Sequence, residues 1–226
     1  MNEKRRARAA ARAEKKSARE RAFQEQCAAL EAAGYAVRDR SVSVGRANWQ
    51  GLLTALPFAA AAIVCGALLS GWKFSLVGKF WADALLFAAS VFVSIPVHEG
   101  LHALFWGAAN GTFKGLSFGI SCGSPYCACG VPMNRAKYLI GVLAPFAILG
   151  AAVSVWGMCV QNGILLALGV FNILCAGGDL LIAAKALFCR AKLLLDHPSR
   201  CGFCAFYPSA AGEQSAFPET DGKTGE

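Results

Sequence analysis

The sequence predicts an all-α membrane protein with about four transmembrane helices and a short β-hairpin in the cytoplasmic loop between the second and third helices. Hydrophobic residues make up 56% of the 226 residues and charged residues only 16%, a balance that is unusual for a soluble domain. Four apolar runs reach the roughly 20 residues that a helix needs to cross a bilayer. They cover residues 51–70, 80–107, 138–160 and 163–188.

The segment before the first apolar run is polar and basic. Residues 4–33 are rich in Ala, Arg, Lys and Glu and are followed by Gly34, which indicates either a basic cytoplasmic helix or a frayed tail. Apolar and polar residues then alternate within residues 35–44, as they do in a half-exposed strand. The first apolar run begins too late for a cleavable secretory signal, so we expect it to stay as an anchor.

These patterns divide the chain into three parts. Residues 1–46 form the basic N-terminal helix or tail, residues 47–208 form the four-span domain, and residues 209–226 form a polar tail that we expect to be disordered.

The distribution of charge predicts the topology. The formal net charge is +8, yet four spans leave only Lys73 and Lys79 on the outer side. The positive-inside rule then places both termini in the cytoplasm and the protein in the cytoplasmic (inner) membrane as a multi-pass protein. Topology and attraction to anionic lipid account for the basic excess, so we expect the bilayer as a partner and no nucleic acid.

The connection between the second and third runs contains a turn signal, Gly-Ser-Pro at residues 123–125. The apolar pieces on either side, LSFGIS and YCACGVPM, favour a short hairpin whose edge strand would bind an extended peptide by adding it to the sheet. An ordinary connecting loop is the alternative. Further along, residues 192–208 resemble a short helix end followed by a compact segment.

A group of ionisable residues, HEGLH, lies inside the second apolar run. His98 and His102 are four residues apart, so on a helix both imidazoles project from one face. This spacing suits two ligands of one tetrahedral zinc ion, and Glu99 is then placed to take a proton from a zinc-bound water. A polar helix end at the membrane surface is the alternative interpretation.

A catalytic zinc needs a third protein ligand and an open fourth position. Asp179 lies about 16 residues into the fourth run, and His98 lies about 18 residues into the second, so the two share one depth in the membrane. We therefore favour Asp179, although a carboxylate that only packs or hydrogen-bonds is the alternative. His197, which precedes Pro198 outside the membrane, is the rival third ligand.

Two further sets of polar residues are candidates for function. Asn172 lies two helical turns before Asp179 and is a candidate for contact with the substrate or its oxyanion, or else for an interhelical hydrogen bond. Several cysteines fall on the cytoplasmic side, where small, semi-buried free thiols are the simpler expectation and a second metal or redox site is the alternative. These are Cys122, Cys127, Cys129, Cys201 and Cys204.

The order of these motifs resembles the zincin peptidases, a family of small bacterial membrane proteins. The segments that carry the resemblance are NWQGLLTALP, PVHEGLHALFWG, SPYCACGVPMNRAKYLIGVLAPF, FNILCAGGDLL and LDHPSRCGF. The resemblance implies a helical membrane metalloprotease in which His98, Glu99 and His102 match the zinc and catalytic motif. The chain is more distantly similar to the site-2 proteases, in which an Asp from a later span completes the zinc site. Asp179 matches that position, but the Asn-Pro stretch and following Gly of that class are absent.

Taken together, the motifs predict a zinc-dependent peptidase that cleaves a peptide bond of a membrane peptide or protein in or near the membrane. His98, His102 and Asp179 are the expected zinc ligands and Glu99 the expected base. The alternatives are a membrane protein that binds a metal or a partner without catalysis, and an ion transporter.

Overall fold

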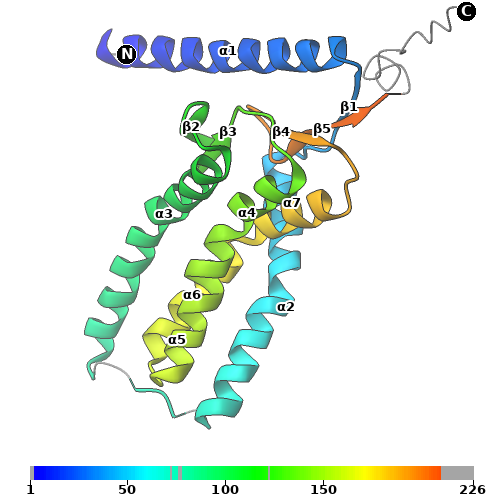
Figure 1. Cartoon of the computed structure of the whole chain (residues 1–226). Coiled ribbons are helices and arrows are strands. Elements are labelled where there is room, and N and C mark those ends of the chain that lie inside the picture. The colour runs from blue at the N-terminus through cyan, green and yellow to red at the C-terminus, as the bar shows by residue number, and fades with distance from the viewer. Residues whose placement is uncertain (1–2, 72, 76–77, 122, 210–226) are drawn as a thin grey trace, which may run out of the picture.

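The computed structural model describes residues 3–71, 73–75, 78–121 and 123–209. Over these residues the chain is mostly helical, and two small sheets lie at one end of a helical bundle, beneath a helix that runs across that end (Figure 1). The helices are α1 (Glu3–Ala32), α2 (Val44–Ser70), α3 (Phe80–Asn110), α4 (Arg135–Pro145), the π-helix η1 (Phe146–Ala152), α5 (Val153–Cys159), α6 (Gly163–Cys175) and α7 (Gly177–Leu187). The strands are β1 (Tyr35–Asp39), β2 (Leu116–Ser121), β3 (Ser124–Cys129), β4 (Leu193–Asp196) and β5 (Phe203–Pro208).

Three helical segments of the described chain are long and apolar enough to cross a membrane, judged by length and composition. They are α2, α3 and the continuous segment formed by α4, η1 and α5. The bent pair α6 and α7 makes a fourth if it is counted as one span. This agrees with the predicted first three runs and is compatible with a multi-pass membrane protein.

The fourth predicted run is broken rather than continuous. Helices α6 and α7 meet at an angle of 52°. Helix α6 closes with the N–H of Ala176 donating to the carbonyl of Asn172, and two glycines follow, which weaken a helix interior. The break turns α7 away from the axis of α6 and puts Asp179 in the first turn of a new helix.

The prediction of an all-α fold is corrected by a three-stranded antiparallel sheet with the order β1-β5-β4. Strand β1 lies within the alternating segment 35–44, as predicted, but residues 192–208 form β4 and β5 rather than a helix end and a compact segment. Their apolar side chains are buried because the sheet lies between α1 on one side and the helix ends on the other. The sheet joins the N-terminal segment to the end of the chain.

The predicted hairpin is present as strands β2 and β3, which pair antiparallel from Leu116 with Cys129 to Ser121 with Ser124. The second strand begins two residues before the expected one, because Ser124 already pairs with Ser121, and Gly123 just before it has a positive φ of 82°. Strand β2 covers one edge of β3 only, so within the described chain the other edge of β3 has no strand partner.

Residues 4–33 were predicted to form either a helix or a frayed tail, and the structure has a helix there. Phe23 and Cys27 of α1 are buried against Leu195, Cys204 and Phe206 of the sheet. Most of the remaining described side chains of α1 are exposed. The predicted C-terminal tail lies outside the described residues except for Ser209.

Candidate metal centre

Helix α3 presents the predicted histidines from one face. The imidazole rings of His98 and His102 have centroids 5.1 Å apart and stand edge to face, as expected for residues four apart on a helix. His102 is 4% exposed, and His98 and Glu99 are half-buried. The motif therefore lies inside the molecule and not at a solvated helix end.

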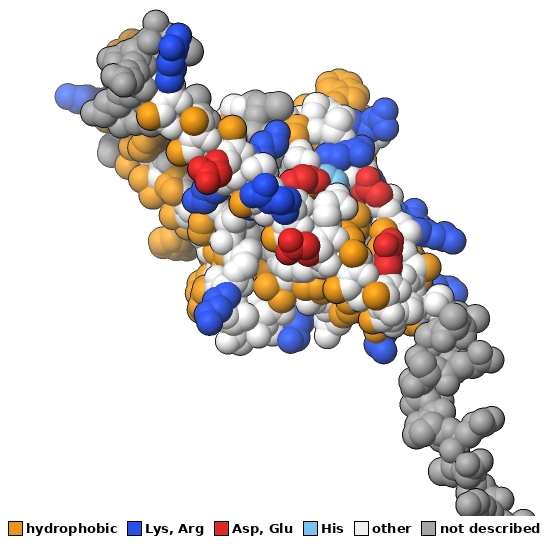
Figure 2. Space-filling model, turned by 90° about the horizontal axis from the view of Figure 1, so that it is seen from above, with side chains coloured by type: hydrophobic (Ala, Val, Ile, Leu, Met, Phe, Trp, Pro, Cys, Tyr) orange, Lys and Arg blue, Asp and Glu red, His pale blue; other side chains and the backbone are white. Residues whose placement is uncertain are grey.

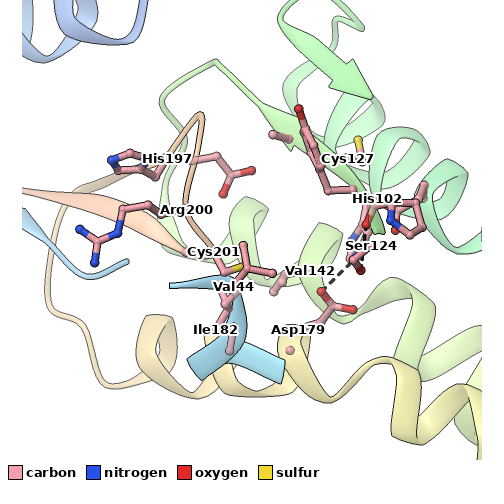
Figure 3. Close-up of a pocket in the computed structure, with 18 of the residues that line it drawn as sticks. Val44, His102, Ser124, Cys127, Val142, Asp179, Ile182, His197, Arg200 and Cys201 are labelled. Carbon is pink, nitrogen blue, oxygen red and sulfur yellow. Dashed lines mark hydrogen bonds and ion pairs between the residues drawn. The ribbon is translucent and has the colours of Figure 1, made fainter. Parts of the chain in front are cut away.

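Asp179 of α7 points at both histidines. One carboxylate oxygen, Oδ2, lies 3.0 Å from Nε2 of His98, and the other, Oδ1, lies 3.4 Å from Nε2 of His102. One ligand atom from each of the three residues lies within 4.8 Å of the others. Two helices that are far apart in the sequence thus bring three metal-ligating groups together, and Figure 3 shows two of them, His102 and Asp179.

Glycines set the position of α7. A Cβ atom on Gly177 would lie 2.4 Å from the carbonyl oxygen of Gly51 in α2, and a Cβ on Gly51 would lie 2.6 Å from the nitrogen of Gly178. Only glycines allow the two backbones to come this close. The contact holds the first turn of α7, and with it Asp179, against the start of α2.

The ring of His102 is held by a backbone carbonyl of α4. Nδ1 of His102 lies 2.9 Å from the carbonyl oxygen of Gly141, which accepts a hydrogen bond from it. This carbonyl is free because the residue four positions later is Pro145, which has no N–H to complete the helical bond. Pro145, which interrupts the helical hydrogen bonding of α4, therefore leaves free the carbonyl that orients the His102 ring of α3.

The donor set fits a metal ion such as zinc. Because Nδ1 of His102 donates to a carbonyl, the neutral ring has an unprotonated Nε2, and this nitrogen faces a carboxylate oxygen that also has no proton to donate. Two acceptors facing each other in a buried place need a cation between them or a second proton on the ring. Two imidazole nitrogens and a carboxylate are a known catalytic zinc set, and metal-ligating histidines typically donate their other N–H to an oxygen as His102 does.

A cleft of about 220 Å³ leads to the three residues. Its walls include five of the six residues of β3, from Ser124 to Ala128, together with the start of α2 and the loop from His197 to Gly202. The carboxylate of Glu99 opens onto the same cleft, which Cys127 of β3 also lines. The free edge of the hairpin thus borders the candidate centre.

His197 and Asn172 are not part of the cluster. His197 lines the outer part of the cleft, on the far side from Asp179 in Figure 3, and its ring packs against Phe23 with centroids 5.0 Å apart. Asn172 is buried, and its side-chain amide donates to the carbonyl of Leu168, 2.9 Å away, within its own helix. Neither side chain is aimed at the three ligand candidates.

The cysteines form no second metal cluster among the described residues. Burial raises the pKa of the Cys127 thiol to about 12 and that of the Cys129 thiol to about 11. Burial likewise raises the pKa of Cys204 to about 12. Thiols with such pKa values stay protonated at neutral pH. Cys129 and Cys204 are buried and Cys127 is half-buried, and all three are free, so the simpler expectation of semi-buried free thiols fits them. Cys122 lies outside the described residues.

The sequence reasoning missed one buried carboxylate beside the cleft. Asp196, at the end of β4, accepts hydrogen bonds from the hydroxyl of Tyr138 at 2.7 Å and from the backbone N–H of Cys129 at 3.0 Å. The available signal was an acidic residue directly after the apolar run Leu193–Leu195, a position where a charge is expensive to bury. Burial raises the pKa of Asp196 to about 6.

The comparison with protein families agrees with this site. Residues 91–194 match the model of a family described as "Putative zincin peptidase". The matched segment contains the HEGLH motif and Asp179 and stops two residues before Asp196. It confirms the resemblance drawn from the motifs, and this family suggests a metallopeptidase. Neither a curated protein nor a solved structure gives a significant match.

Proposed function

We propose that the protein is a zinc-dependent peptidase embedded in the membrane, with His98, His102 and Asp179 as zinc ligands and Glu99 as the catalytic base. The observation that carries the proposal is the convergence of three ligand atoms within 4.8 Å from helices α3 and α7. The buried pair of acceptors at His102 and Asp179 supports a cation at this point.

Zinc bound by these residues would lower the pKa of a water molecule and polarise the scissile carbonyl. Glu99 follows His98 directly and shares its cleft, so its carboxylate is placed to accept the proton of the attacking water. The same carboxyl group then donates the proton to the leaving amine. The Gly141 carbonyl keeps the His102 imidazole in position throughout.

The substrate of this site is an extended segment of a membrane peptide or protein. The edge of β3 that has no strand partner within the described chain borders the cleft, and we propose that an extended chain binds along this edge. Addition to β3 brings the peptide alongside Glu99, whose carboxylate already lies next to the backbone of Cys127.

Several features support a bilayer around the helices. Large apolar side chains of α2 and α3 are exposed, among them Leu68, Trp81 and Phe92, and hydrocarbon would cover them. Lys and Arg side chains, with Asp and Glu between them, occupy the end that carries α1 and the sheets (Figure 2). The positive-inside rule assigns this end to the cytoplasm, so the cleft would receive water and substrate from the cytoplasmic side of the inner membrane.

The test is peptide cleavage by the full chain in lipid nanodiscs, with zinc content measured on the same samples. Glu99→Gln keeps the ligands and removes the base, so we expect bound zinc to remain and cleavage to fall by about 10³-fold or more. His197→Ala serves as the matched control and should leave both unchanged. Zinc retained by the wild-type protein, with no cleavage of any membrane peptide offered, would favour a metal-binding protein without catalysis.

A further inference from the structure

Asp196 is a buried acidic residue for which the proposed reaction has no direct use. Its side chain is 9% exposed, and it holds groups of two other elements, the Tyr138 hydroxyl of α4 and the Cys129 N–H of β3. Burying a carboxylate is unfavourable, and these two hydrogen bonds offset part of that cost. Asp196 therefore ties β4 at once to the helix behind the metal centre and to the strand beside it.

Tyr138 continues the connection toward the ligands. Its ring is fully buried and lies 5.8 Å from that of Trp106, centroid to centroid. Its backbone carbonyl accepts a hydrogen bond from the indole N–H of Trp106 at 3.1 Å. Tyr138 thus holds Trp106 by a ring contact and a hydrogen bond.

Trp106 in turn forms one wall of the metal centre. Its indole stacks on the imidazole of His102, with centroids 5.2 Å apart and ring planes 19° from parallel. Trp106 also fills the space beside Gly141, where an added Cβ would lie 2.0 Å from the indole Cδ1. The indole is therefore packed between the candidate ligand His102 and the residue whose carbonyl holds that ligand.

We propose that Asp196 is a positioning residue for the metal centre. It acts on His102 through Tyr138 and Trp106, and it holds the C-terminal end of β3 through the Cys129 N–H. The inference rests on the proposed metal site but not on peptidase activity. Loss of the carboxylate releases the Tyr138 hydroxyl and lets the stacked rings shift. The His102 ring then no longer matches the position set by His98 and Asp179, and the metal binds less tightly.

The experiment measures zinc affinity of the full chain by competition with a chelator, and the absorption spectrum after loading with Co²⁺. Asp196→Leu and Tyr138→Phe should each lower zinc affinity by about 10- to 100-fold, the range typical of groups that support metal ligands, and should shift the Co²⁺ bands. Asp196→Asn keeps an acceptor for the Cys129 N–H and an amide facing the Tyr138 hydroxyl, so it should restore affinity to near that of the wild type.

Tyr207→Phe is the matched control, because the Tyr207 hydroxyl also makes a hydrogen bond in the same core, to the Cys189 sulfur at 3.2 Å. It should change neither zinc affinity nor the Co²⁺ spectrum. If Asp196→Leu does not fold, Tyr138→Phe decides, since it removes a single oxygen. Wild-type affinity and an unchanged spectrum in folded Tyr138→Phe would overturn the positioning role alone, whereas a wild-type chain that binds no zinc would overturn the metal site as well.

Discussion

His102 is oriented by the carbonyl of Gly141, and that carbonyl is available because Pro145 cannot use it. The distance from Nδ1 to the oxygen is 2.9 Å, and the proline stands four residues after the glycine, where a helical N–H would otherwise donate. The proline in α4 is thus connected to the orientation of a candidate ligand in α3. Changes at Pro145 should therefore alter metal binding at the proposed site.

Pro145→Ala supplies an N–H that competes for the Gly141 carbonyl. We expect zinc affinity to fall by about 10-fold, because the His102 ring loses part of its fixed orientation. Pro57→Ala is the control, since Pro57 interrupts α2 in the same way without a contact to a ligand candidate. Equal zinc affinities in the two variants, measured by chelator competition, would argue against this role of the carbonyl.

Gly177→Ala tests how α7 is held. The added methyl group would meet the backbone of Gly51 at 2.4 Å, so the helices must separate and move Asp179 away from the histidines. We expect a loss of about 1–3 kcal/mol in the free energy of unfolding together with weaker zinc binding. Gly178→Ala has no atom within 4 Å of the new carbon and should be tolerated. Identical behaviour of the neighbouring variants would show that the close approach does not set the site.

The stability of the protein should fall as pH rises through the range set by Asp196. Burial raises the pKa of this carboxyl group from 3.8 to about 6, so between these values the folded chain keeps a proton that the unfolded chain has lost. Unfolding then releases a proton and becomes more favourable with rising pH, by about 3 kcal/mol in total, with no further change above pH 6 from this group.

Asp196→Asn removes this contribution and leaves those of the other ionisable groups. The unfolding free energies of variant and wild type are measured after chelation of metal at several pH values from 4 to 7. As pH rises, the variant should become more stable relative to the wild type. A difference that stays constant over this range would contradict the raised pKa.

Phe23 is the apolar anchor of α1 on the sheet. It is buried with Leu195, Cys204 and Phe206, whereas most described side chains of α1 are exposed. Phe23→Ala should cost about 3–5 kcal/mol in the packing of α1 and make this helix the first site of limited proteolysis, with zinc content unchanged. Gln24→Ala, at an exposed position, is the control. If the protease cleaves α1 of Phe23→Ala no faster than α1 of Gln24→Ala, contacts other than Phe23 hold this helix on the sheet.

The local patterns of the sequence were sufficient for the helices and for the approach of Asp179 to the histidines. The four-residue spacing of His98 and His102 fixes their common face, and the depth of each residue in its apolar run placed Asp179 level with His98; the observed distance is 3.0 Å. The hairpin was visible because its turn residues are adjacent in the sequence. Each of these inferences needs only a helical rise, a turn or a count of residues.

The remaining features depend on partners distant in the chain. Strand β5 pairs with β1 across most of the sequence, and nothing in FCAFYP specifies that partner. The close contact of Gly177 with Gly51 of α2, directly after the break between α6 and α7, joins residues more than a hundred positions apart. Asp196 becomes informative only when the hydroxyl of Tyr138 is known to face it. Strand pairing, close backbone contacts and the hydrogen bonds of buried polar groups depend on tertiary structure, so the periodicity of the sequence does not predict them.

The most direct measurement of the central claim is the zinc content of the purified full chain and of two variants. The wild-type protein should hold about one zinc ion per chain, Asp179→Ala should hold almost none, and His197→Ala should retain the wild-type amount. Zinc retained in Asp179→Ala and lost in His197→Ala would contradict the site formed by His98, His102 and Asp179.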